Sequence, residues 1–128
     1  GEWTISVVDV IPNGTDLVMA ENQFNDPPAE GRQFFIATLN ATYNGSGSAT
    51  FLFNVTVSAV GQSSVAYGEF EDRCGVIPNE LPTSEVFEGG TITGNVCWSV
   101  SSEDADSLVM FADVGFSSDN RIYFSLQR

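Results

Sequence analysis

Apolar and polar residues alternate with a period of two along most of this 128-residue chain, and such alternation is typical of half-buried β-strands. In the segment 33–43, every second residue from Phe35 to Tyr43 is apolar or aromatic, whereas Thr38, Asn40 and Thr42 lie between them. The same pattern predicts further strands at 3–11, 51–60, 65–70, 91–100, 107–112 and 121–126. The segment 16–21 has the character of a short helical turn.

This strand pattern predicts one all-β domain over residues 1–128. About seven strands, spaced roughly ten residues apart and separated by turn segments, are typical of an antiparallel β-sandwich. Alternation places Phe51, Phe53 and Val55 on the inner face of one strand. It also places Trp3 and Trp98 in the core. No repeat, linker or low-complexity segment divides the chain.

The scarcity of basic residues excludes many functions. Seventeen acidic residues stand against four arginines, so the net charge is −13, and the chain has neither histidine nor lysine. Ser-His-Asp and Cys-His nucleophiles, imidazole metal ligands, Schiff-base lysines and phosphate-binding P-loops are therefore excluded. A pI near 4.1 also disfavours binding to nucleic acid and to anionic membranes, so neither is expected as a partner.

Carboxylates are the remaining abundant chemical groups. Glu69, Glu71 and Asp72 lie close together in the sequence, and paired carboxylates can act as acid and base in glycoside hydrolysis. A small β-sandwich usually lacks a substrate cleft, however, and the Asp-Thr-Gly motif of aspartic proteases is absent from the sequence. The sequence therefore predicts a protein that is not an enzyme.

Cys74 and Cys97 are the two cysteines of the chain. Their spacing matches neither a zinc site nor a Cys-x-x-Cys redox motif, so they are interpreted as a structural disulfide. Such a bridge closes a loop of about two dozen residues and stabilises the fold by ~3 kcal/mol in the chain-entropy model. A structural disulfide predicts an extracellular or cell-surface location. No signal peptide or membrane-spanning apolar run is present in the sequence. If the protein is exported, Gly1 is a mature or trimmed start, and a signal, linker or lipid anchor could have preceded it.

Four sequons make asparagine-linked glycosylation a candidate modification of the surface. They begin at Asn13, Asn40, Asn44 and Asn54, of which two fall in predicted turns and two on the outward faces of predicted strands. A threonine-rich β-protein also acquires such triplets by composition alone, so the alternative of unmodified asparagines stays open.

The segment 101–106 is a candidate calcium site, because it places Glu103, Asp104 and Asp106 in one turn. Calcium prefers several oxygen ligands, and flexible turns can supply them. The segment lacks the glycine and the distal glutamate of an EF-hand loop, and a solvated acidic turn is the alternative. No other metal or cofactor is expected.

Three segments, taken in order, resemble a known family. A Trp-led strand at 3–7 comes first, the motif Asn-x-Phe-Asn-x-Pro-Pro follows within 21–35, and a strand with the pattern Gly-x-x-x-x-Gly-x-Val-x-Trp lies within 88–98. Together they resemble DUF4352, a family of bacterial extracellular domains that share an immunoglobulin-like fold with a secreted mycobacterial immunoprotective antigen. The resemblance spans nearly the whole chain and implies an immunoglobulin-like β-sandwich that is secreted or surface-attached. It implies no active-site residues, and we interpret Asn25, Pro27, Pro28 and Gly31 as loop-shaping residues.

The residues and the resemblance together predict a non-catalytic, exported or cell-surface immunoglobulin-like module that binds protein partners. One alternative is a structural subunit of an extracellular filament or surface layer, assembled by strand pairing at a sheet edge. The strand that begins at Trp3 is a candidate for such self-association, because it starts almost at the chain end. A second alternative is an accessory domain that binds a small ligand or a carbohydrate, which should have a concave aromatic or acidic pocket.

Overall fold

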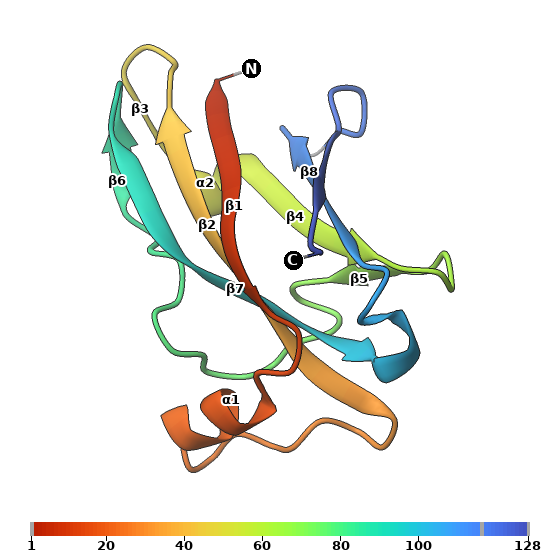
Figure 1. Cartoon of the computed structure of the whole chain (residues 1–128). Coiled ribbons are helices and arrows are strands. Elements are labelled where there is room, and N and C mark those ends of the chain that lie inside the picture. The colour runs from red at the N-terminus through yellow and green to blue at the C-terminus, as the bar shows by residue number, and fades with distance from the viewer. Residues whose placement is uncertain (1, 116, 128) are drawn as a thin grey trace.

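Two antiparallel β-sheets face each other in the computed structural model, which describes residues 2–115 and 117–127 (Figure 1). The first sheet has the order β1-β2-β7, with bounds Trp3–Ile11, Arg32–Tyr43 and Thr91–Ser101. The second sheet has the order β5-β4-β8-β9, with bounds Ala66–Gly68, Val55–Val60, Val109–Val114 and Ile122–Ser125. The predicted antiparallel β-sandwich is thus confirmed.

Shorter elements complete the fold. β3 (Ser48–Thr50) and β6 (Glu85–Phe87) form a separate two-stranded sheet. The helix predicted at 16–21 is present as α1 (Thr15–Glu21), a second helical turn is α2 (Phe51–Asn54), and a 3-10 turn (Ser102–Asp104) follows β7. Within the described ranges, no helix is long and apolar enough to cross a membrane.

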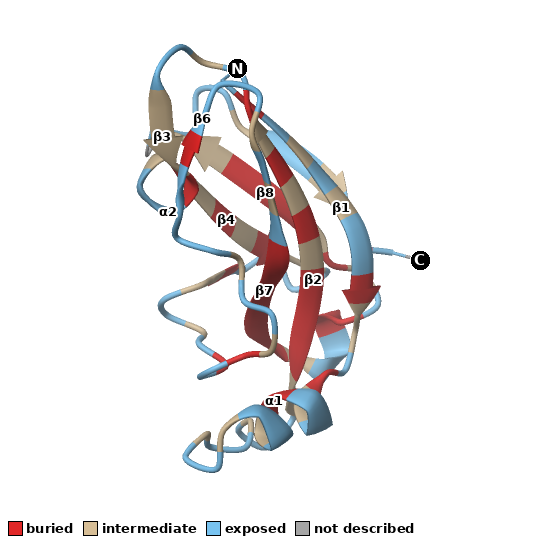
Figure 2. Ribbon diagram, turned by 90° about the vertical axis from the view of Figure 1, so that its left-hand side faces the viewer, coloured by how far each residue is buried: buried red, intermediate tan, exposed pale blue. Residues whose placement is uncertain are grey.

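β2 is the central strand of the first sheet and is buried along most of its length (Figure 2). β1 pairs with it on one side and β7 on the other, both in antiparallel register. Its odd-numbered residues from Phe35 to Tyr43 belong to the main core, as the alternation predicts. Phe34 and Ile36 point the other way and are also buried, in a second and smaller core.

The second core lies between α1 and the outer face of the first sheet. Val18 of α1 packs there with Phe34, Ile36 and the disulfide. The amide of Gly14 donates a hydrogen bond to the carbonyl of Phe34 at 2.7 Å, and Ile36 leaves no room for a side chain at Gly14. The helix therefore covers apolar residues that β2 would otherwise expose.

Aromatic residues fill part of the main core between the sheets. The ring centroid of Trp3 lies 5.0 Å from the centroids of both Tyr43 and Phe51. The Trp3 Nε1 atom donates a hydrogen bond to Asn54 Oδ1 at 2.6 Å. Trp98 is fully buried in the same core, so both tryptophans lie inside as predicted.

The strand predicted at 51–60 begins four residues later than expected. Phe51–Asn54 form the helical turn α2, and Phe53 is 72% exposed rather than inward-facing. In a helical turn, positions i and i+4 share a face, so Phe51 and Val55 both reach the main core while Phe53 points away. The helical turn therefore buries one phenylalanine where the alternation predicts two.

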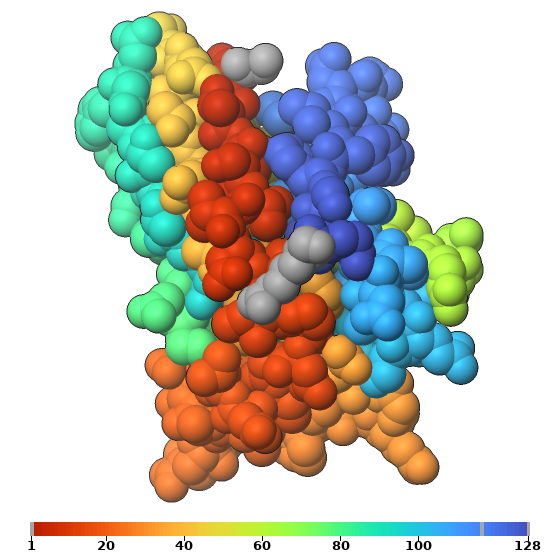
Figure 3. All heavy atoms as spheres, viewed as in Figure 1, coloured from red at the N-terminus to blue at the C-terminus, as the bar shows by residue number. Residues whose placement is uncertain are grey.

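The first strand pairs with β2 of its own chain, from Trp3 at one end to Ile11 at the other. Its register with β2 shifts between Val7 and Asp9, which marks a bulge or irregularity. β1 and β9 are edge strands of different sheets, and they lie against each other on one side of the sandwich (Figure 3). Association of two copies at a sheet edge stays a prediction.

Residues 69–83, which we call the edge loop, follow β5 and cover the other side of β7. The amide of Ser99 donates to the carbonyl of Asp72 at 2.9 Å, and the amide of Asn95 donates to the carbonyl of Asn79 at 2.8 Å. A Cβ atom at Gly94 would lie 2.4 Å from the Cα atom of Leu81. The absence of a side chain at Gly94 thus permits the close approach of loop and strand.

Candidate ligand-binding pocket

A disulfide between Cys74 and Cys97 joins the edge loop to β7, as the sequence predicts. The two Cα atoms lie 6.1 Å apart, and both residues are buried. The bridge and the backbone hydrogen bonds together hold the loop on the first sheet, while its preceding strand, β5, belongs to the second. The loop therefore spans the side of the sandwich between the two sheets.

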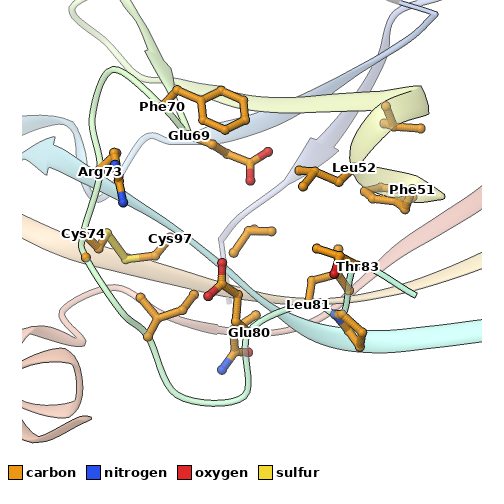
Figure 4. Close-up of a pocket in the computed structure, with 16 residues that line it drawn as sticks. Phe51, Leu52, Glu69, Phe70, Arg73, Cys74, Glu80, Leu81, Thr83 and Cys97 are labelled. Atoms are coloured by element: carbon orange, nitrogen blue, oxygen red, sulfur yellow. A yellow bond between two sulfur atoms is a disulfide. The ribbon is translucent and has the colours of Figure 1, made fainter. Parts of the chain in front are cut away.

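A pocket of about 290 Å³ lies at this position, between the edge loop, β7 and the junction of α2 with β4 (Figure 4). Its apolar lining comes from all three parts: Phe51, Leu52, Val55, Phe70, Ile77, Leu81, Pro82 and Val96. Its polar lining includes Glu69, Arg73, Glu80, Thr83 and Asn95. Apolar walls with a few polar groups are typical of sites for small molecules.

Two carboxylates reach into the pocket, one from each end of the edge loop (Figure 4). Glu69 directly follows β5, whereas the backbone of Glu80 forms an isolated parallel β-bridge with Asn95 of β7. Burial raises the pKa of Glu69 to about 7. A hydrogen bond with the backbone of Val57 lowers this pKa in part, and the negative charge of Glu80 raises it further. The pocket thus holds a carboxyl group that changes its charge near neutral pH.

Arg73 supplies the third charged side chain of the pocket and lies near the disulfide (Figure 4). Arg32 forms an ion pair with Asp72 at 3.1 Å, and Arg121 forms one with Asp113 at 2.7 Å. Arg73 forms no ion pair with any residue that the structure describes. Its guanidinium group is therefore available to a ligand or to solvent.

The Asn-x-Phe-Asn-x-Pro-Pro segment lies beside the edge loop, and its second asparagine binds the loop. The Nδ2 atom of Asn25 donates to the carbonyls of Val18 and Val76 at 2.8 and 2.7 Å, and its Oδ1 atom accepts from the amide of Val76 at 2.9 Å. A Cβ atom at Gly75 would collide with Asn25, and Gly31 has a φ of +81°. These contacts agree with the interpretation of this segment as loop-shaping.

The sequence cluster of Glu69, Glu71 and Asp72 divides in space. Glu69 enters the pocket, whereas Asp72 pairs with Arg32 and accepts a hydrogen bond from the amide of Gly68 at 3.0 Å. Glu71 is exposed and does not line the pocket. The carboxylate that faces Glu69 in the pocket is therefore Glu80, and not Glu71 or Asp72, which are the neighbours of Glu69 in the sequence.

The candidate calcium ligands are also separated. Asp104 is enclosed and accepts hydrogen bonds from the amide and hydroxyl of Ser63 and from the hydroxyl of Tyr67, whereas Glu103 and Asp106 are exposed. Hydrogen bonds from Ser63, which has the larger effect, and from Tyr67 lower the pKa of Asp104. Within residues 2–115 and 117–127, no three acidic or cysteine side chains gather in a group that could hold a metal ion. The calcium prediction thus gains no support from this turn.

The four sequon asparagines lie at the surface to different degrees. Asn13 and Asn44 are exposed in turns, as the sequence predicts, whereas Asn40 and Asn54 are half-buried. The Oδ1 atom of Asn40 accepts a hydrogen bond from Thr93 at 2.6 Å, and that of Asn54 accepts the bond from Trp3. Glycosylation at any of the four positions stays a prediction.

Sequence reasoning singles out Glu69 but misses Glu80, Arg73 and the apolar wall of the pocket. These residues are brought together by the path of the edge loop along β7, which depends on the close approach at Gly94 and on the disulfide. A glycine within an alternating strand is the one sequence signal of this contact, because it often marks a close approach of another backbone.

No protein-family model matches this chain, so membership in DUF4352 stays a prediction. No curated protein matches it in sequence either. Among solved structures, the chain is similar to MPT63, a secreted protein from Mycobacterium tuberculosis, with 14% identity, a TM-score of 0.55, and coverage of 90% of this chain and 76% of that one. A conserved hypothetical protein from Bacillus anthracis also matches, with 14% identity, a TM-score of 0.46, and coverage of 78% and 72%. The similarity to MPT63 shows a shared β-sandwich fold.

Proposed function

We propose that this chain is a non-catalytic, exported immunoglobulin-like module that binds a small ligand, or one side chain of a protein partner, in the pocket under the edge loop. The observation that carries the proposal is the pocket of about 290 Å³, with an apolar wall and three charged side chains. This volume is close to the lower end of the range for small-molecule sites, about 300 to 1,000 Å³. This pocket favours the second alternative from the sequence, which is a small-ligand domain with a concave aromatic or acidic pocket.

The disulfide supports the exported location. Structural disulfides persist in oxidising compartments and are rare in the cytosol. The bridge between Cys74 and Cys97 is buried and holds the loop that forms the pocket, which is a structural role. MPT63, which has the same fold, is described as a secreted protein, and we propose the same location for this chain.

The side chains of the pocket support binding rather than catalysis. The chain has no histidine and no lysine, so the pocket has no imidazole base or lysine nucleophile. A carboxyl group of raised pKa beside a second carboxylate is the combination that glycoside hydrolases use, and hydrolysis is therefore the competing activity to check. We expect no release of nitrophenol from aryl glycosides, and turnover that disappears in Glu69→Gln would overturn the non-catalytic proposal.

Mapping of amide shifts in ¹⁵N-labelled protein tests whether the pocket binds. A mixture of small aromatic amines, alcohols and acids should shift amides of the edge loop and of 94–97 on β7. Thr83→Tyr places a larger side chain at the pocket and should abolish these shifts, whereas Ser84→Tyr adds the same ring beside the pocket and should preserve them. Shifts that are scattered over the surface, or that survive Thr83→Tyr, would contradict the proposal.

A further inference from the structure

We propose that the pocket selects ligands in which a single positive charge is attached to a compact apolar body, such as an arylalkyl amine. This inference rests on the proposed function, because it assigns a ligand class to the same pocket. The inference depends on the two carboxylates that face the cavity, on the apolar surface beside them and on the position of Arg73.

The charge balance of the pocket favours a cation. Its charged side chains are Glu69, Glu80 and Arg73, because α2, β4 and β7 contribute only uncharged residues to the lining. When both carboxyl groups are ionised, the pocket therefore carries an excess of one negative charge. No described basic group neutralises Glu69 or Glu80 through an ion pair. A ligand ammonium group between them would supply the missing positive charge.

The apolar surface beside the carboxylates suits the body of such a ligand. Figure 4 shows Leu52, Phe51 and Thr83 on the side of the pocket away from Arg73. Leu52 and Phe70 line the pocket and yet are exposed, Phe70 to 67%, so a ligand that covers them removes apolar surface from water. The face of an aromatic ring also attracts a nearby cation. The small volume suits one ring with a short chain better than an oligosaccharide.

Ionisation of Glu69 makes this selection depend on pH. Among the described residues, the other charged side chains that line the pocket with Glu69 are Glu80 and Arg73. Burial and the charge of Glu80 raise the pKa of Glu69 to about 7, and a bound cation opposes this by favouring the ionised form. Binding of a cation below this pH therefore releases a proton, so affinity for the cation increases as the pH rises through 7.

Calorimetric titration of the protein with three matched probes tests the inference. The probes are 2-phenylethylamine, its neutral analogue 2-phenylethanol and the anion 3-phenylpropanoate. At about pH 8 we expect the amine to bind about tenfold more tightly than the alcohol, with the anion weakest. Between about pH 6 and pH 8 the affinity for the amine should increase by about five- to tenfold, whereas that for the alcohol should stay constant.

Charge-removing variants locate the effect. Glu69→Gln and Glu80→Gln should each reduce the preference for the amine over the alcohol by about three- to tenfold, and Glu69→Gln should also remove the pH dependence. Glu88→Gln, which removes one exposed negative charge outside the pocket, serves as the matched control and should leave the preference unchanged. Glu80 is exposed, so the Glu80→Gln variant keeps the test valid even if Glu69→Gln affects folding.

The outcomes separate this inference from the proposed function. Equal binding of amine and alcohol, or tighter binding of the anion, with amide shifts in the pocket, would overturn the inference and leave the proposed function standing. An amine preference that survives in both pocket variants would also overturn it. If none of the three probes shifts amides of the pocket, the inference and the proposed function both fail.

Discussion

Two carboxyl groups, the buried Asp104 and the half-buried Glu69, have pKa values that are shifted in opposite directions. Asp104 accepts three hydrogen bonds, which favour its ionised form, so its pKa is lowered. Glu69 is half-buried, and the loss of hydration together with the negative charge of Glu80 raises its pKa to about 7. Asp104 therefore stabilises the fold in its charged state, whereas Glu69 does so in its neutral state.

Replacement of Asp104 by Ala should lower the free energy of unfolding by about 3 kcal/mol at neutral pH, because hydroxyl and amide donors lose a charged acceptor. The pKa of Asp104 is lowered in the fold, so its contribution is present above its unfolded value and is lost as the pH falls through the folded value. The difference between variant and parent, measured by urea denaturation, should therefore shrink in acid. Asp106→Ala, in the same turn but exposed, should change stability little at either pH.

Glu69→Gln should have the opposite pH dependence. The raised pKa means that the parent loses stability as the pH rises from the unfolded value of about 4.5 through the folded value of about 7. A neutral glutamine avoids this loss, so the variant should be more stable than the parent by about 1 to 2 kcal/mol at pH 8 and nearly equal to it at pH 4. Thermal melts at the two pH values check this, and a variant that is less stable than the parent at both would contradict it.

At the scale of elements, the edge loop depends on few anchors. It contains no helix or strand, and it lies on β7 through backbone hydrogen bonds and the disulfide. The cysteines also belong to the smaller core beneath α1, together with Ile77 of the loop. Loss of the bridge should therefore affect the loop, this core and the pocket more than the main core.

Replacement of both cysteines by serine should lower the free energy of unfolding by about 3 kcal/mol, because the bridge closes a loop with a sequence separation of 23 residues. Far-ultraviolet circular dichroism should retain the β-sheet spectrum, since the main core does not contain the bridge. Amide shifts upon addition of pocket ligands should be lost. Unchanged stability, together with unchanged ligand binding, would show that the hydrogen bonds position the loop without the bridge.

The long elements could be predicted from sequence, because their burial follows the period of the strand. β1, β2 and β7 occur where alternation predicts them, and the odd-numbered face of β2 forms the core. Alternation wrongly predicted an inward-facing Phe53, because a helical turn there lets Phe51 and Val55 both reach the main core. It also could not place Glu80 or Asp104, since their environments come from loops whose paths are set by distant partners.

For the whole molecule, the net charge of −13 bears on self-association. Like-charged copies repel one another, most strongly at low ionic strength where screening is weak. β1, the strand considered for pairing between copies, is already paired with β2 and has an irregular register near its middle. Bulges at sheet edges disfavour the addition of further strands.

Sedimentation velocity at low salt should therefore show a monomer of 13.8 kDa. If the protein were instead a filament subunit, association should appear or increase when added salt screens the charges. Pro substitution at the exposed Val8 of β1 would then test this edge, because a proline has no amide hydrogen to donate to an added strand. Dimers or polymers that resist this substitution would contradict pairing at β1.

The way in which the edge loop is attached has a consequence for protein engineering. It is anchored by main-chain hydrogen bonds, by the cystine, by the side chain of Asn25 and by the close approach at Gly94, whereas Glu80 and Thr83 at the pocket are exposed side chains. Randomising these two positions should leave the framework intact while it changes the chemistry of the cavity. In a display library built on this scaffold, variation at these two positions would therefore change ligand specificity, as sequence variation in a hypervariable loop does in an antibody. The cystine would keep the loop attached to β7.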